Sequence, residues 1–128
     1  MKTIVLAYND TNDSDRALER TAELAGFYDA KVVVTSVVPV LVGGKPPETP
    51  GPELEHAGAL LRERGIEPVL VEAVGEIAEA IIEVAESHGG DLIIVGTREL
   101  SQVERLLGHS VSEGVQRMAR CDVLIVHS

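Results

Sequence analysis

The sequence predicts an α/β protein with an open parallel five-stranded sheet and helices on both faces. Five short apolar runs recur along the 128 residues, and helical patterns separate them. Most of these runs lack a polar–apolar alternation, which is typical of strands buried on both faces of a parallel sheet. The length fits one domain, which we assign to residues 1–128.

The first strand is predicted at residues 4–8, where Ile, Val, Leu and Ala form an apolar run. A helix over residues 13–27 follows, because its apolar residues recur on one broad face. Thr11 or Asn12 can cap the start of this helix, and Gly26 lies near its end.

The second and third strands are predicted at residues 32–38 and 69–74, both rich in Val. Between them, the proline-rich stretch 45–52 can form neither a strand nor the interior of a helix, so we expect an exposed connector within the domain. A short helix is predicted at residues 54–63, and Gly65 ends it.

The remaining elements continue this alternation. A helix is predicted at residues 76–87, where apolar residues recur every three or four positions. The fourth and fifth strands are predicted at 92–95 and 123–126. The helix between them, 110–118, opens with Ser-Val-Ser-Glu, a capping-box pattern.

The charge balance argues against a general nucleic-acid function. The chain has 21 acidic and 11 basic residues, a formal charge of -10, and such a surface repels phosphate backbones. The single cysteine excludes an internal disulfide framework and fits a reducing compartment. The first apolar run is too short for a signal peptide, and no stretch approaches the roughly 18 apolar residues of a membrane span. We expect a cytoplasmic protein with no membrane or nucleic-acid partner.

The stretch from Gly96 to His109 is the best candidate for a binding site. It is much longer than the strand-to-helix loops of about 2–6 residues found in α/β units. It follows the carboxyl end of the fourth strand, where open α/β sheets bind ligands. It also leads to a helix start at Ser110, where unpaired N–H groups and a partial positive charge suit an anion. The sequence therefore predicts an anion-binding loop here.

Other groups of reactive residue types have plain structural interpretations. Cys121 has no activating partner in the sequence and is expected to be a buried or half-buried thiol. The pairs Glu72 and Glu76, and Asp13 and Asp15, are interpreted as solvated charges rather than as acid–base pairs. The histidines lack the spacing of zinc ligands. We therefore predict no catalytic residues and no metal site.

Five segments carry the motifs of one known family. They are IVLAYNDT at 4–11, GEIAEAI at 75–81, DLIIVGT at 91–97, and the stretches 106–113 and 121–126. In this order and at these spacings, over essentially the whole chain, they resemble the universal stress protein family. The resemblance implies a strand order of 3-2-1-4-5 and a role in stress response. It also implies a protein partner, which the sequence does not identify.

The resemblance further implies a division between two branches. One branch binds ATP in the loop after the fourth strand through the motif G-x-x-G, nine residues, G and Ser or Thr; the other lacks these glycines and does not bind. Gly96 and Ser110 match the first glycine and the hydroxyl residue. Glu99 and His109 occupy the other two glycine positions, and Gly108 lies one residue before the second of them.

Carried over by position, the resemblance implies a nucleotide site with ATP, and with Mg²⁺, as its cofactor. Asn9 stands where the family usually has Asp, so this position lacks the charge that helps to hold a metal ion between phosphates. Tyr8 is bulkier than the usual occupant of its position. The implied nucleotide-binding residues are Ala7, Tyr8, Asn9, Val37, Val95, Gly96, Glu99, Gly108, His109, Ser110, Val111 and Ser112.

The last strand is predicted to form a homodimer. In the implied order it is an edge strand that is apolar on both faces, and such an edge invites pairing. The edge strand at the other side carries Glu72, a charge that protects it. We expect Val123, Leu124, Ile125 and Val126 of two copies to meet antiparallel about a two-fold axis, as the resemblance also implies.

Three functions stay open at this point. The first is a stress-response regulator that senses a ligand, either ATP or another adenine nucleotide. The second is a universal stress protein that binds no nucleotide and acts as an interaction dimer. The third is a nucleotide-dependent enzyme, such as a weak ATPase or a phosphotransferase. Because no general base or metal-holding acid is placed for turnover, we expect binding rather than catalysis.

Overall fold

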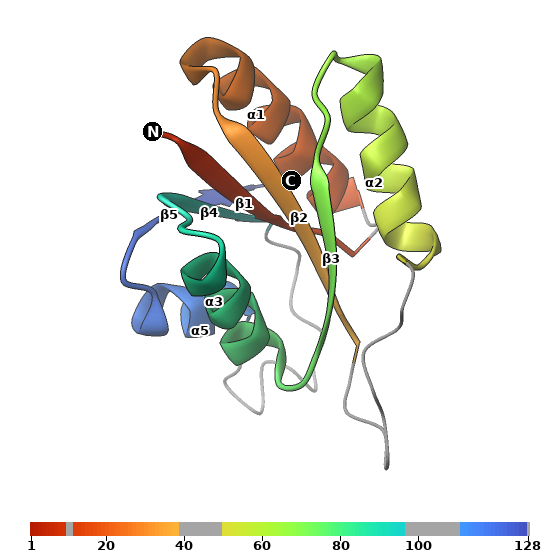
Figure 1. Ribbon diagram of the computed structural model, residues 1–128. Helices are drawn as coiled ribbons and strands as arrows, with labels where there is room; N and C mark the ends of the chain where they lie inside the picture. Colours follow the sequence, from red (N-terminus) through yellow and green to blue (C-terminus); the bar gives the residue numbers. More distant parts are fainter. Residues whose placement is uncertain (10–11, 39–49, 97–110, 128) are drawn as a thin grey trace.

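The computed structural model describes residues 1–9, 12–38, 50–96 and 111–127 (Figure 1). Its elements are β1 (Thr3–Ala7), α1 (Asn12–Tyr28), β2 (Lys31–Val38), α2 (Pro52–Glu63), β3 (Val69–Val74), α3 (Ile77–Ser87), β4 (Leu92–Gly96), α5 (Val111–Met118) and β5 (Asp122–Val126). This alternation confirms the predicted α/β class. Within the described ranges, no helix combines the length and the apolar character needed to cross a membrane.

The five strands form one parallel sheet in the order β3-β2-β1-β4-β5. The order implied by the family resemblance is therefore confirmed. β3 has the predicted bounds, and the other strands differ from their predicted bounds by one residue at one or both ends. β1 lies at the centre between β2 and β4, and β3 and β5 are the two edges of the sheet.

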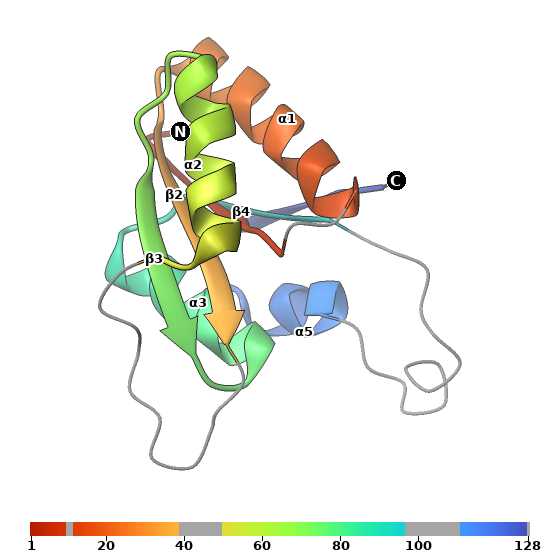
Figure 2. The ribbon, with the colours of Figure 1, turned by 90° about the vertical axis from the view of Figure 1, so that its right-hand side faces the viewer.

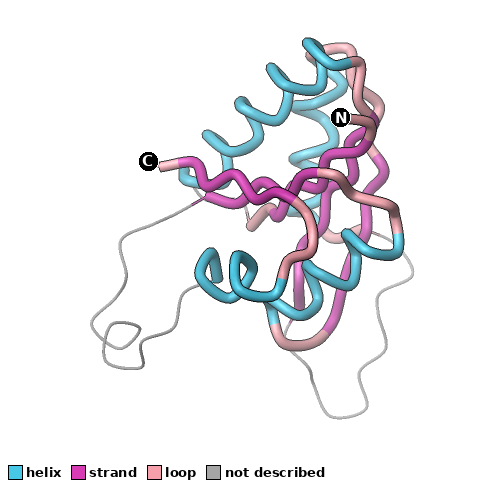
Figure 3. The backbone as a smooth tube through the Cα atoms, turned by 90° about the vertical axis from the view of Figure 1, so that its left-hand side faces the viewer, coloured by secondary structure: helices cyan, strands magenta, loops and turns pink. Residues whose placement is uncertain are grey.

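Helices cover both faces of the sheet, with α1 and α2 on one face and α3 and α5 on the other (Figures 2 and 3). Successive strand side chains point to opposite faces. In β1, Ile4 and Leu6 pack with α1 and α2, whereas Val5 packs with α3 and α5. All three side chains are fully buried. Burial on both sides explains why the strand sequences show so little alternation.

The start of α2 is held against the sheet by two acidic side chains. The Gly51 N–H donates to Glu72 Oε2 at 3.0 Å, and the Ser36 hydroxyl donates to Glu53 Oε2 at 2.9 Å. α2 begins at Pro52, two residues before the predicted start, because proline suits the first helical position. Glu72 therefore does more than charge an edge strand: it fixes the turn that leads into α2.

The ends of α1 and α3 depend on residues that the sequence analysis did not identify. α1 continues past Gly26 to Tyr28, and Asp29 follows with a φ of 53°. The Ala30 N–H then donates to the Ala25 carbonyl at 3.0 Å, which closes a Schellman-type end. At α3, Glu76 is the cap before the helix, and its carboxylate accepts from two N–H groups of the first turn.

At the amino-terminal end of the sheet, Asp91 holds the beginning of β1. Its Oδ2 accepts hydrogen bonds from the backbone N–H groups of Lys2 and Thr3, each at 2.9 Å. These two bonds, from Lys2 and then from Thr3, lower the pKa of the Asp91 carboxyl. The Asp91 N–H in turn donates to the Thr3 carbonyl at 2.8 Å. One residue thereby connects the start of β4 to the start of β1.

Candidate functional site

The carboxyl ends of β1 and β4 form the topological switch point of the sheet. The two strands are neighbours, but α1 follows β1 onto one face and α5 follows β4 onto the other. In open α/β sheets, ligands bind outside the carboxyl ends of the strands at such a point. The predicted site residues at the ends of β1 and β4 meet here.

Three of the predicted residues share the α3/α5 face of the sheet near this point. They are Ala7 on β1, Val37 on β2 and Val95 on β4, and all three belong to the apolar layer on this face. Val95 is buried, whereas Ala7 and Val37 are half-buried. Gly96, also half-buried, ends β4 directly after Val95. The structure therefore brings these residues to neighbouring strand ends, as a small apolar surface on one side of the switch point.

Tyr8 lies in the opposite layer. Its side chain is 2% exposed and packs with α1 and α2, and its hydroxyl donates to Asp15 Oδ1 at 2.6 Å. The His56 ring of α2 lies with its centroid 6.4 Å from that of the Tyr8 ring. The Tyr8 N–H continues the pairing of β1 by donating to the Thr35 carbonyl at 2.9 Å. The bulk of Tyr8 is thus on the other face from Ala7, Val37 and Val95.

Asn9 is hydrogen-bonded to Ser14 in the first turn of α1. Its N–H donates to Ser14 Oγ at 3.1 Å, and the Ser14 hydroxyl donates back to Asn9 Oδ1. The amide oxygen of Asn9 therefore already accepts a hydrogen bond. A neutral amide held in this way is a poor ligand for Mg²⁺, which prefers carboxylate oxygens.

Gly114 allows α5 to pack closely on α3. A Cβ at Gly114 would lie 2.9 Å from the Cβ of Ala78. α5 begins at Val111, so the N–H groups of its first turn lack partners within the helix. The predicted residues Glu99, Gly108, His109 and Ser110 lie outside the described residues, as do the side chains of Val111 and Ser112.

Thr35 is a residue that the sequence analysis missed. It lies on β2 between Val33 and Val37, on the α3/α5 face, and is fully buried. Among the residues that the structure describes, its Oγ1 is the one buried side-chain polar atom without a hydrogen-bond partner. In the sequence Thr35 is one of two adjacent hydroxyl residues within an apolar run, and nothing there distinguishes it from Ser36, which does have a partner.

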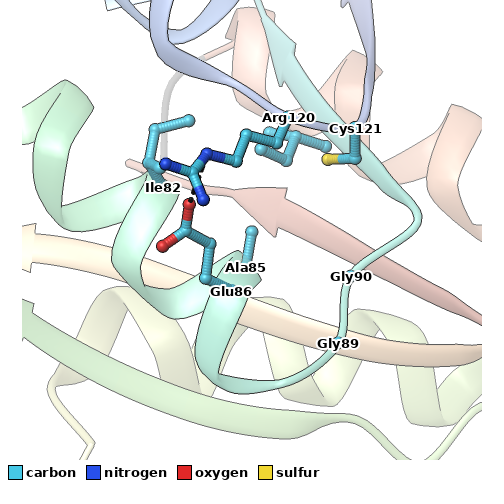
Figure 4. Close-up of a pocket in the computed structure, with 8 residues that line it drawn as sticks. Ile82, Ala85, Glu86, Gly89, Gly90, Arg120 and Cys121 are labelled. Carbon is cyan, nitrogen blue, oxygen red and sulfur yellow. Dashed lines mark ion pairs between the residues drawn. The ribbon is translucent and has the colours of Figure 1, made fainter.

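A separate cavity of about 450 Å³ lies at the other end of the sheet (Figure 4). Its lining comes from α3, from the segments before β4 and β5, and from β4 itself. The lining residues are Ile82, Ala85, Glu86, Gly89, Gly90, Ile93, Arg120 and Cys121. Arg120 and Glu86 point toward one another across it, with Nε and Oε1 3.8 Å apart. None of the predicted nucleotide-binding residues that the structure describes lines this cavity.

Cys121 is half-buried beside this cavity, as predicted. Burial is the main cause that raises the pKa of its thiol, and the negative charges of Asp122 and Asp91 raise it further. A raised pKa leaves less of the nucleophilic thiolate at neutral pH. In the described part of the chain, moreover, no group of three or more His, Cys, Asp or Glu side chains gathers as a metal site would require.

Comparison with known proteins places these features in a family. The model of the universal stress protein family matches residues 1–127. The universal stress protein Rv1636 of Mycobacterium tuberculosis is 30% identical to this chain, over 99% of this chain and 97% of that protein. Both findings cover the predicted site as well as the sheet.

Solved structures show the same architecture. A universal stress protein in complex with cAMP superposes with a TM-score of 0.82 at 26% identity, covering 98% of this chain and 97% of that one. A universal stress protein from Archaeoglobus fulgidus in complex with dAMP has a TM-score of 0.76 at 20% identity, covering 98% of each chain. At that lower identity, the second likeness concerns the fold alone.

Proposed function

Because this chain belongs to the universal stress protein family, we propose that it is a small regulatory protein that binds an adenine nucleotide at the carboxyl ends of β1 and β4. Binding, rather than turnover, is its output: nucleotide occupancy would change how it contacts a protein partner. ATP is one candidate ligand, and AMP and cAMP are the others.

The observation that carries this proposal is the position of Ala7, Val37 and Val95 in the apolar layer on the face of the sheet that α3 and α5 cover. The half-buried Ala7 and Val37 offer an apolar surface for a base. The first turn of α5 offers N–H groups and a partial positive charge for a phosphate. The family match and the likeness to a protein solved with cAMP support the same ligand class.

Asn9 favours a nucleotide bound without a metal ion. Its amide oxygen accepts from the Ser14 hydroxyl, and it carries no charge to hold Mg²⁺ beside phosphates. We therefore expect that ATP binding to the wild-type chain changes little when Mg²⁺ is removed. Asn9→Asp restores a carboxylate at this position and should make ATP binding depend on Mg²⁺.

Titration calorimetry of the full chain with AMP, cAMP and ATP tests the proposal, each with and without Mg²⁺. We expect one nucleotide per chain. Ala7→Leu fills the apolar surface and should lower the affinity about tenfold or more, equivalent to about 1.4 kcal/mol. Ala30→Leu is the matched control, because Ala30 is also half-buried but lies before β2, at the other end of the sheet. Absence of heat with all three nucleotides would contradict the proposal.

The free edge of β5 supports a second proposal, that the chain forms a homodimer. β5 is an edge strand, and Val123, Leu124, Ile125 and Val126 are only half-buried in one copy. Antiparallel pairing of two β5 strands about a two-fold axis would cover this apolar edge. Light scattering should show a dimer at micromolar concentration, and Leu124→Lys should yield monomer. A monomeric wild-type chain would contradict the pairing but not nucleotide binding.

A further inference from the structure

Thr35 carries an unusual buried hydroxyl. The side chain is fully buried, and its Oγ1 has no partner within the described structure. The neighbouring buried hydroxyl of Ser36 donates to Glu53, and that of Thr21 donates to the Ala17 carbonyl at 2.8 Å. A buried hydroxyl without a partner destabilises a fold, whereas valine has nearly the same shape and no polar atom. Stability alone therefore does not explain threonine at this position.

The strand register places Thr35 between the two residues proposed to contact a base. Ala7 pairs with Thr35 across β1 and β2, so their Cα atoms are separated by about 4.8 Å, the spacing of neighbouring strands. Val37 lies two residues further along β2, on the same face and about 6.6 Å away. A planar base that contacts both Ala7 and Val37 must therefore pass beside Thr35.

We propose that the Thr35 hydroxyl hydrogen-bonds the base of the bound nucleotide. This inference rests on the proposed function and assigns a specificity-determining residue within that site. A threonine hydroxyl both donates and accepts, so it can pair with a ring nitrogen or with the exocyclic amine of adenine. Thr35 is the buried residue next to the half-buried Ala7 and Val37, and a rotation about its χ1 can reorient the hydroxyl.

Thr35→Val tests the proposal because it removes the hydroxyl and retains the shape. Without ligand, this variant should melt at a higher temperature than wild type, by roughly 3–5 °C, since an unpaired buried hydroxyl is lost. Its affinity for AMP should fall about fivefold, the effect of one net hydrogen bond. Adenosine should show the same fold-change, because the contact is to the base and not to the phosphate.

Thr35→Ser is the matched control, since it retains the hydroxyl and loses only a methyl group. Its affinities for AMP and adenosine should stay within about twofold of wild type, even where its melting temperature falls. If Thr35→Val binds both ligands as wild type does, Thr35 has no contact with the base, and the proposed function stands without it. If only AMP loses affinity, a base contact is excluded. If wild type binds neither ligand, the proposed function itself fails.

Discussion

Replacing Tyr8 by Phe separates the stability of the fold from binding at the site. Tyr8 is among the residues that the family resemblance implies for nucleotide binding, but its hydroxyl lies in the α1/α2 layer, 2.6 Å from Asp15 Oδ1. A short hydrogen bond to a charged group contributes about 1.5–3 kcal/mol. Because Asp15 is half-buried, solvent screens this bond, and we expect Tyr8→Phe to lower the free energy of unfolding by about 1–2 kcal/mol.

The affinity for AMP should stay within about twofold of wild type in this variant, since no atom on the α3/α5 face changes. Urea denaturation followed by circular dichroism measures the free energy of unfolding, and calorimetry measures the affinity for AMP. The matched control is Tyr28→Phe, at the exposed end of α1, where we expect less than about 0.5 kcal/mol of change. Unchanged stability together with a large loss of affinity would refute this placement of Tyr8.

Three further outcomes are expected. The contribution of Asp91 to stability should be complete well above pH 3.8 and be lost as the pH falls below that value. The reason is that hydrogen bonding lowers the folded-state pKa of its carboxyl. Acid unfolding curves of Asp91→Asn that match those of wild type would contradict this. Cys121 should react with iodoacetamide at pH 7 more slowly than a free cysteine peptide, since burial raises the pKa of its thiol, and an equal rate would show an accessible thiolate. Gly90→Ala would bring a Cβ to 2.8 Å from Val5 Cγ2 and should destabilise the fold by about 1–3 kcal/mol. Gly26→Ala, with nothing within 4 Å, should stabilise it by about 0.5–1 kcal/mol; the same sign for both would be evidence against the packing described.

The strands could be predicted closely because apolar character alone decides them. The run 69–74 has the bounds of β3, since all its residues except Glu72 are apolar and Gly75 follows it. The order of the strands, in contrast, cannot be predicted from the apolar runs themselves. It was implied by motifs that resemble a known family. The structure confirms that order.

The features that the sequence did not predict are helix ends and side-chain hydrogen bonds. These depend on residues that become neighbours only in the folded chain. Gly26 predicts a helix end near residue 27. α1 instead continues to Tyr28, and Asp29 takes the left-handed conformation that ends it. Glu76 caps α3, although glutamate is not among the preferred cap residues Ser, Thr, Asp and Asn. Thr35 could not be distinguished from Ser36 by sequence, because only the sheet shows which hydroxyl meets a carboxylate.

The face to which Tyr8 points likewise required the sheet. Alternation along a strand assigns neighbours to opposite faces, but the sequence does not state which face carries the ligand. The helices show only on which face each neighbour lies: α1 and α2 cover Tyr8, while α3 and α5 cover the side of Ala7. Of the implied site residues that the structure describes, Tyr8 therefore lies on one face of the sheet, and Ala7, Val37 and Val95 lie on the other.

A titration with AMP, followed by backbone amide NMR spectra, tests the proposed site most directly. Binding at the switch point predicts the largest shifts at Ala7, Val37 and Gly96, with little change at Glu86 and Cys121 beside the separate cavity. Shifts centred on Glu86 and Cys121, or no shifts at saturating AMP, would contradict a nucleotide site at the carboxyl ends of β1 and β4.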